Sequence, residues 1–153
     1  MVGCNWNEDW SDILRNVIFK DDELKQLMLI PEGTKIMDFV ERYFIKAGYA
    51  TNPLTNEAVR VVYNTYRSSD TNNPYVTRNE MSFNIYVKYT KLQGAVRDGL
   101  ILRTNLIADR LNNMLTKKRL NSYKFRCCGE TDMDTSVTGY VRYNITFEYK
   151  KTY

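Results

Sequence analysis

The sequence predicts an α+β fold in which a four-stranded, mostly antiparallel sheet carries helices packed on one face. Three observations predict this class. Apolar residues recur at helical spacing before residue 48, they alternate at every second position from residue 58 onward, and one more helical stretch separates two pairs of alternating runs. The chain has 153 residues, a length typical of one domain with one core. We expect a single domain over 1–153, with an N-terminal helical segment at 8–48 and a β-β-α-β-β unit at 58–150.

The N-terminal segment is expected to hold three helical pieces. Ser11 precedes the apolar set of the first helix and is placed to cap it. Asp21 opens a second, short helix, which a proline and a glycine end before residue 34. A third piece begins at Thr34 and stops at Gly48. Its β-branched and aromatic content leaves a strand as the alternative.

The remaining elements follow from the change of period. Two strands are expected to form a hairpin with a long polar loop at 68–79, and two more to close the chain around a polar turn at 129–136. One amphipathic helix separates the two pairs. The expected strands are 58–67, 81–90, 122–128 and 137–151, and the helix is 100–115.

The composition removes several kinds of catalysis. The chain has no histidine, and the common triads that activate a serine or a cysteine need an imidazole. Cys4, Cys127 and Cys128 are an odd number without zinc-site spacing, so we expect reduced thiols. There is no glycine-rich phosphate loop, no apolar stretch of bilayer length and no leader-like N-terminus. We expect a soluble protein made in a cytoplasm, with no enzymatic activity, no cofactor and no membrane contact.

Three carboxylates stand at every second position: Glu130, Asp132 and Asp134. In a continuing strand they would share one face and could bind Mg²⁺ or Ca²⁺. The surrounding sequence is turn-like, lacks the glycine that a calcium loop needs at its bend, and has no partner acids at a recognisable spacing. A solvated turn is the preferred interpretation, and a metal-dependent enzyme is the least favoured hypothesis.

Charge and aromatic content point to binding. Residues 1–76 carry 8 basic and 11 acidic side chains, and residues 77–153 carry 14 and 7. Such asymmetry suits either head-to-tail association or a nucleic-acid surface. The 12 tyrosines suit both strands and interfaces. A stacking platform for RNA over 123–126 is disfavoured, because alternation places its aromatic and basic residues on opposite faces.

The order and the closing residues carry a resemblance. The hairpin AVRVVYNTYR and MSFNIYVKYT, the helix LILRTNLIADRLNNML and the final VTGYVRYNITFEYKKTY follow N-terminal helices. Over about residues 8–151, this arrangement resembles the tail terminator and tail-completion proteins of long-tailed bacteriophages. The resemblance implies a structural virion protein that forms a ring, usually a hexamer, at the head-proximal end of the tail.

Such a ring would stop polymerisation of the tail tube and join the tail to the neck or connector. The implied partners are other copies of the chain, tail-tube proteins and neck or connector proteins, and DNA would pass through without specific recognition. The implied location is the tail or neck of the virion, after assembly in the host cytoplasm. A head-to-tail adaptor of the same neck is a related alternative, and a small basic nucleic-acid-binding α+β module is another.

Residues for contact with neighbours are chosen by polarity and charge. They lie in the long hairpin loop, in the basic cluster after the helix and in the polar turn. This cluster is expected to be a solvated helix end, with a phosphate contact as the alternative. The candidate interface residues are Tyr75, Arg78, Lys117, Lys118, Arg119, Asp132 and Asp134.

Overall fold

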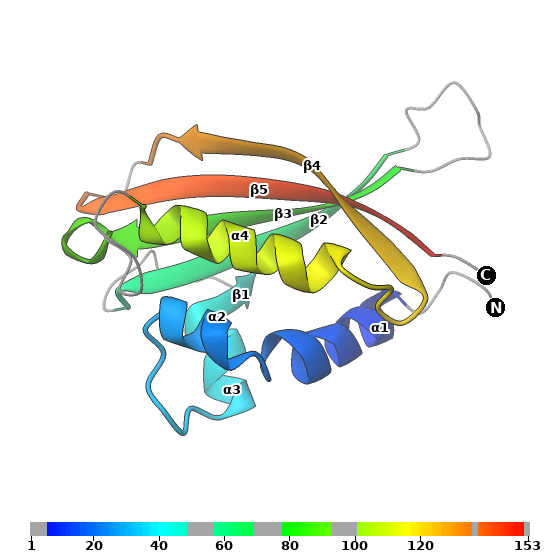
Figure 1. Cartoon of the computed structure of the whole chain (residues 1–153), viewed down its shortest axis with the longest axis horizontal. Coiled ribbons are helices and arrows are strands. Elements are labelled where there is room, and N and C mark those ends of the chain that lie inside the picture. The colour runs from blue at the N-terminus through cyan, green and yellow to red at the C-terminus, as the bar shows by residue number, and fades with distance from the viewer. Residues whose placement is uncertain (1–5, 49–56, 69–77, 93–100, 136–137, 152–153) are drawn as a thin grey trace.

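A computed structural model describes residues 6–48, 57–68, 78–92, 101–135 and 138–151. Five strands form one mixed sheet in the order β1-β2-β3-β5-β4 (Figure 1). The strands are β1 (Phe44–Lys46), β2 (Val59–Ser68), β3 (Arg78–Lys88), β4 (Tyr123–Met133) and β5 (Tyr140–Lys151). β1 pairs parallel to β2, and the other neighbours are antiparallel. The α+β class is confirmed, with one strand more than expected.

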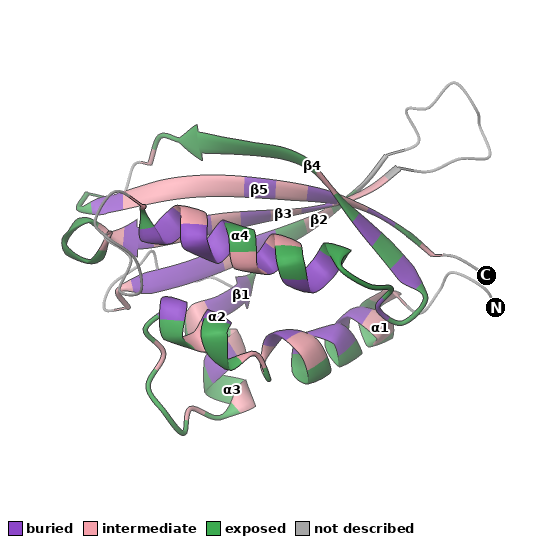
Figure 2. Ribbon diagram, viewed as in Figure 1, coloured by how far each residue is buried: buried purple, intermediate pink, exposed green. Residues whose placement is uncertain are grey.

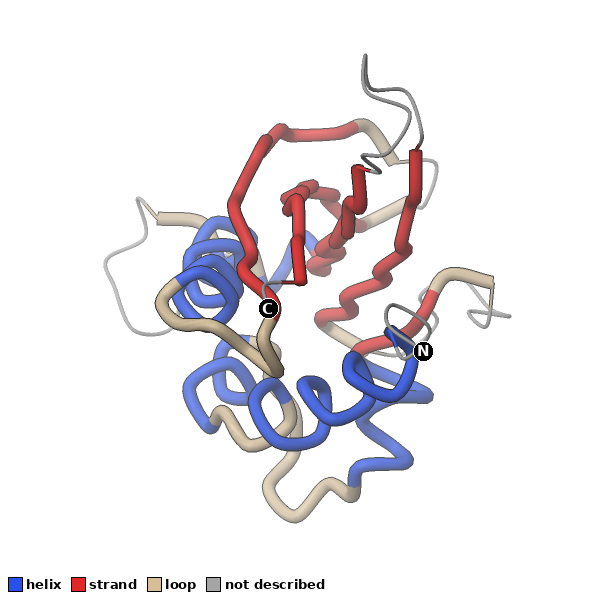
Figure 3. Tube along the Cα trace, turned by 90° about the vertical axis from the view of Figure 1, so that its right-hand side faces the viewer, coloured by secondary structure: helices blue, strands red, loops and turns tan. Residues whose placement is uncertain are grey.

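The helical elements are grouped on one side of the twisted sheet (Figure 3). They are α1 (Trp6–Ile13) with the π-helical turn η1 (Leu14–Ile18), α2 (Asp22–Leu27), α3 (Ile36–Asp38) with the π-helical turn η2 (Phe39–Tyr43), the 3-10 turn η3 (Tyr89–Lys91) and α4 (Arg103–Thr116). None of the described helices is long and apolar enough to cross a membrane.

The core lies between the sheet and this helical layer (Figure 2). Alternation along β3 turns four side chains inward, and all are fully buried: Met81, Phe83, Ile85 and Val87. From α4, the fully buried Ile107, Leu111 and Leu115 belong to the same apolar cluster. The period of two in the strands and the apolar stripe of the helix therefore meet as the sequence predicts.

The first helix begins earlier than expected. α1 starts at Trp6, so Ser11 lies inside the helix and is not its cap. The reason is an aromatic contact: the ring of Trp6 stacks on Tyr149 of β5 with 4.1 Å between centroids. Burial of large rings stabilises this extra turn.

The third predicted piece is partly helix and partly strand, the two structures that its sequence allowed. It starts as α3 and η2, and then becomes the short strand β1 beside β2. Thr34 does not cap it, because Lys35 occupies the cap position and the Thr34 hydroxyl donates to the Pro31 carbonyl at 2.6 Å. Phe44 and Ile45 of β1 are buried, so the chain joins the sheet where its apolar side chains can be covered.

Two arginines fasten α4 to the rest of the helical layer. Arg103 is buried, and it donates to the carbonyls of Leu27 and Lys91 at 2.9 Å each. Arg110 binds the Asp21 carboxylate through Nε and Nη2. The same carboxylate accepts from the Leu24 amide at 2.8 Å and caps α2, as its position predicts. α4 is therefore held at its first residue and near its middle.

A tight turn sends the chain from α4 into β4. Asn121 and Ser122 both have positive φ, and the backbone amides and carbonyls of Leu120 and Tyr123 are mutually hydrogen-bonded. A two-residue turn of this kind matches the twist of the strands that it joins. β4 then continues to Met133, so the expected polar turn at 129–136 is wrong for its first five residues.

Candidate interface surfaces

A bulge in β4 changes which of its side chains face the helices. The register shifts between Cys127 and Gly129. After the shift, Glu130 stands opposite Ile145 and Asp132 opposite Tyr143, which are positions on the helical side of the sheet. An extra residue in one strand reverses which side chains face the core. Carboxylates therefore take the inward positions that aromatic residues hold in the first half of β4.

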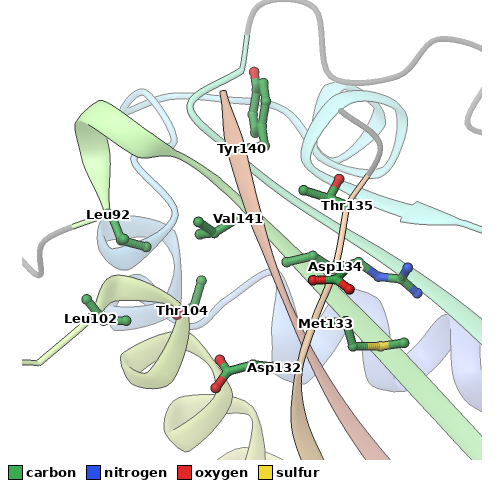
Figure 4. A pocket seen from close by; sticks show the side chains of 10 residues that line it. Leu92, Leu102, Thr104, Asp132, Met133, Asp134, Thr135, Tyr140 and Val141 are labelled. Atoms are coloured by element: carbon green, nitrogen blue, oxygen red, sulfur yellow. The ribbon is translucent and has the colours of Figure 1, made fainter. Parts of the chain in front are cut away.

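Asp132 and Asp134 line an open cavity of about 470 Å³ between the end of β4, the start of β5 and the N-terminal end of α4 (Figure 4). Figure 4 shows Asp132 pointing from β4 toward α4. Leu102 and Met133 line the cavity with exposed fractions of 37% and 39%. The cavity thus combines apolar side chains, two carboxylates and the guanidinium of Arg142.

The pKa of Tyr143 is affected by the carboxylates of this region. Burial raises the pKa of its phenol, and the nearby Glu130 and Asp132 carboxylates raise it further. Asp109 of α4 contributes in the same direction. Asp109, Glu130, Asp132 and Asp134 are exposed and have no ion-pair partner in the part of the chain that the structure describes. We call these four residues and the cavity the acidic cleft.

A basic cluster occupies the other end of α4. Lys117, Lys118 and Arg119 follow directly after the helix and are exposed. None of the three forms an ion pair within the described ranges. Figure 1 shows the end of β4 and the segment that follows α4 at opposite ends of this helix. This cluster, which we call the basic helix end, and the acidic cleft therefore lie at opposite ends of α4. The helix dipole favours both placements, since it attracts anions at the N-terminus and cations at the C-terminus.

The seven candidate interface residues are therefore divided between separate places. Asp132 and Asp134 are brought together in the acidic cleft, and the three basic residues form the basic helix end. Arg78 opens β3 opposite Ser68, and Tyr75 lies outside the described residues. Sequence reasoning missed Asp109 as a member of the cleft, because only packing of α4 on β4 brings it there.

The charge asymmetry between the two halves of the sequence suggested that each half would form one of two opposed charged surfaces, and the structure differs from this. β2 from the first half lies between β1 and β3, so the halves are interleaved in one sheet. Both charged surfaces come from the second half of the chain. Opposed charge exists in this molecule, and it results from the two ends of α4 rather than from the two halves of the sequence.

The structure shows where the metal-binding and thiol side chains of the described residues lie. No group of three or more histidine, cysteine, aspartate or glutamate side chains in the described residues is arranged to hold a metal ion. Cys127 is half-buried and Cys128 is exposed, and both are free thiols. The third cysteine, Cys4, lies outside the described residues.

A comparison with protein families shows the family of the chain. The YomW family matches residues 11–149. The chain belongs to the YomW family. This is a domain family derived from Bacillus phages of the SPbeta-like prophage type, so the chain is a phage-related protein. No curated protein matches it.

Proposed function

We propose that this chain is a structural subunit of a phage tail, which assembles head to tail into a ring at the head-proximal end. The ring would end polymerisation of the tail tube and join the tail to the neck. The observation that carries the proposal is the placement of two oppositely charged patches at the two ends of α4, whose residues form no ion pair within the described ranges. The phage-derived family and the element order support the same assignment.

The two surfaces fit a heterologous interface. In such an interface one patch of a subunit binds a different patch on the next copy, and the same contact can repeat until a ring closes. The basic helix end of one copy would bind the acidic cleft of its neighbour. Opposite charges at the two patches favour this register and disfavour cleft-to-cleft or end-to-end pairing.

Apolar contact would supply much of the affinity. Exposed ion pairs contribute little by themselves. Leu102 and Met133 are partly exposed beside the carboxylates, so a neighbour seated in the cleft would remove them from water. Charge would then govern the choice of partner, and burial would stabilise the contact. The number of six copies comes from the resemblance to tail terminators.

The experiment is the solution mass of the protein, measured by light scattering after size exclusion, over a wide concentration range and at low and high salt. A discrete mass near six times the 18.1 kDa of the chain, lost at high salt, is expected. Screening by salt weakens contacts between exposed charges. A monomer up to about millimolar concentration at low salt would contradict the proposal.

Two matched variants make the test specific to the interface. The first carries Asp132→Asn and Asp134→Asn, and the second carries Lys117→Gln and Lys118→Gln. Each variant alone is expected to stay monomeric, because it lacks one of the two patches. An equal mixture has one intact pair of patches, so it is expected to form a dimer and nothing larger. If either variant still forms the full ring, the contact lies elsewhere.

A tail-tube partner distinguishes a terminator from a head-to-tail adaptor of the same neck. A terminator is expected to shorten tubes when it is added to polymerising tube protein. An adaptor is expected to leave tube length unchanged and to bind the connector. Electron microscopy of the tubes measures the difference, with the variant of Asp132 and Asp134 as the control.

A further inference from the structure

The face of the sheet that no described helix covers is polar and internally bonded. Residues of β3 and β5 form a continuous chain of side-chain hydrogen bonds on it. Asn144 donates to the Ser82 hydroxyl at 2.6 Å and to Asn84 Oδ1 at 3.0 Å, and Thr146 donates to Asn144 Oδ1 at 3.0 Å. All of these side chains are half-buried. This face is therefore an ordered surface, although it lies outside the core.

Arg142 stands at one end of this chain of hydrogen bonds with a neutral partner. Its Nε and Nη2 donate to Asn84 Oδ1 at 3.1 and 2.9 Å. The guanidinium also lies over the ring of Tyr86, 5.9 Å from the centroid. No carboxylate pairs with it in the described part of the chain. Arg142 is thus a positioned cation without an ion pair in the described residues, and it stands at the border of this face, because it also lines the cavity that Asp132 and Asp134 line.

Two lysines stand directly opposite each other farther along β5. Lys124 of β4 and Lys150 of β5 are register partners, and both are exposed. Like charges at such positions destabilise a sheet. Neither lysine has an ion-pair partner among the described residues, whereas their neighbours Arg126 and Glu148 pair with each other. A bound anion between these lysines would relieve their repulsion.

Aromatic rings accompany these cations. Tyr66 of β2 is 58% exposed, and the half-buried Tyr86 of β3 lies beside Arg142. Both rings lie on the helix-free face, because they alternate with the buried Val61 and Tyr63 of β2 and Ile85 and Val87 of β3. Lys88, half-buried at the end of β3, belongs to the same face. This surface therefore has cations and rings of the kinds that contact a nucleic-acid backbone and its bases. It also carries the register partners Glu80 and Glu148, of which Glu148 is paired with Arg126.

We propose that the helix-free face binds the sugar–phosphate backbone of DNA without reading its sequence. From Arg142 to Lys150 the strand spans about 27 Å, at about 3.4 Å per residue. Phosphates follow one another at about 3.4 Å of axis on each strand of a duplex. Arg142 and the pair of lysines can therefore contact separate phosphates of one strand. This inference goes beyond the proposed ring, and a single copy of the chain is sufficient for it.

The sequence pointed away from this face for a specific reason. In β4, the aromatic Tyr123 and Phe125 are buried while Lys124 and Arg126 face outward, as alternation predicts. The rings on the outer face come instead from β2 and β3. Only the strand order places Tyr66 and Tyr86 on the same face as the cations of β4 and β5.

The experiment is fluorescence anisotropy of labelled 20-nucleotide single-stranded and duplex DNA, titrated with the full chain at several salt concentrations. Dissociation constants near 10⁻⁴ to 10⁻⁶ M are expected, as for other non-specific DNA binding. With three or four phosphates neutralised, the logarithm of the association constant should fall with that of salt with a slope of about −3 for duplex. Sequences of different composition should bind alike.

Variants locate the contact. Lys124→Gln with Lys150→Gln is expected to weaken binding and reduce the salt slope by about two. Lys20→Gln with Lys35→Gln removes the same charge from exposed sites in the helical layer, and it should leave most of the affinity. Arg142→Gln should also weaken binding, but it removes two hydrogen bonds to Asn84. The substitutions of the exposed Lys124 and Lys150 leave the hydrogen-bond chain intact.

Two outcomes would overturn the proposal. One is the absence of salt-sensitive binding by the native chain at low salt. The other is an equal loss from the two lysine variants, which would mean that net charge alone attracts DNA. Loss of single-strand binding with retention of duplex binding on Tyr66→Ala would identify base stacking as the source of the single-strand affinity. Because the two lysine variants leave both the acidic cleft and the basic helix end intact, a difference between them in DNA affinity is independent of the solution mass.

Discussion

Arg110 contributes most clearly among single residues to joining the N-terminal segment to the β-β-α-β-β unit. Its guanidinium contacts Asp21 through two nitrogens and Glu23 through Nη1 at 3.1 Å. These contacts raise the pKa of Arg110, first through the hydrogen bond with Asp21. The Asp21 side chain is only 10% exposed. Without Arg110, this carboxylate would stay largely shielded from water and would lose its charged partner.

Arg110→Ala is therefore expected to lower the free energy of unfolding by about 1–3 kcal/mol, because a largely buried carboxylate loses its charged donor. Urea denaturation followed by circular dichroism measures the loss. Arg126→Ala is the matched control, since the Arg126 side chain is 71% exposed in its pair with Glu148. A loss from Arg126→Ala as large as that from Arg110→Ala would refute this interpretation.

Buried phenols make the fold sensitive to alkali. Burial raises the pKa of Tyr63, and it is also the largest cause of the raised pKa values of Tyr140 and Tyr143. The neutral phenol is therefore favoured in the folded state. Its contribution to stability is complete below the unfolded pKa of about 10 and is lost as the pH rises through the higher folded values.

We expect stability to stay level through neutral pH and to fall above about pH 10. Phenolate absorbance and circular dichroism, recorded together from pH 8 to pH 12, measure this. Some of the 12 tyrosines should ionise early with the fold intact, and the buried ones only as it unfolds. Ionisation of all phenols in one step near pH 10, with the circular dichroism unchanged, would be the contrary result.

At the scale of an element, α4 owes its stability to packing rather than to caps. Its N-cap residue, Leu102, makes no side-chain capping bond. Eight of its residues are buried, against the sheet and the N-terminal segment. Helices of this length are marginal in water by themselves, and an apolar face against a sheet stabilises them.

Leu111→Ala is expected to cost about 2–5 kcal/mol, since Leu111 is fully buried and a cavity would remain. Asn113→Ala, at an exposed position of the same helix, should be neutral or slightly stabilising. Thermal unfolding of both variants gives the comparison. If both changed the midpoint equally, helix propensity rather than core packing would dominate α4.

β4 illustrates how an edge strand is kept from uncontrolled pairing. It is a long outer strand, and its second half is exposed throughout. The strand contains a bulge and carries charged side chains. Lys124 and Arg126 point outward before the bulge, and carboxylates follow after it. Charges and bulges of this kind discourage edge-to-edge association. Association through the ends of α4 would leave the backbone edge of β4 unpaired.

At the scale of the whole molecule, charge is arranged along α4 and across the sheet. The acidic cleft and the basic helix end lie at the two ends of α4, and the helix-free face carries Arg142, Lys124 and Lys150 without described ion-pair partners. Assembly is thus assigned to side chains at the two ends of α4 and DNA binding to side chains of the helix-free face, with Arg142 at the border between that face and the cleft. Substitutions in the acidic cleft should change the solution mass, and substitutions on the helix-free face should change DNA affinity.

The sequence by itself determined most of the elements. Periods of two and 3.6 residues predicted β2, β3, β5 and α4 within a few positions, because those patterns reflect which side chains a pleated sheet or a helix turns toward the core. The position of the basic helix end was likewise predictable, since Lys117 follows directly after the amphipathic pattern. These features depend on neighbours in sequence.

Only the tertiary structure decided what depends on distant partners. β1 exists because Phe44 lies beside Val61 of β2, and α1 starts at Trp6 because Tyr149, near the other end of the chain, covers it. The acidic cleft required the bulge at Cys127, which turned Asp132 toward α4. Local patterns carry no information about which strand will pair or where a register will shift, because those outcomes are set by contacts made after the chain has folded back on itself.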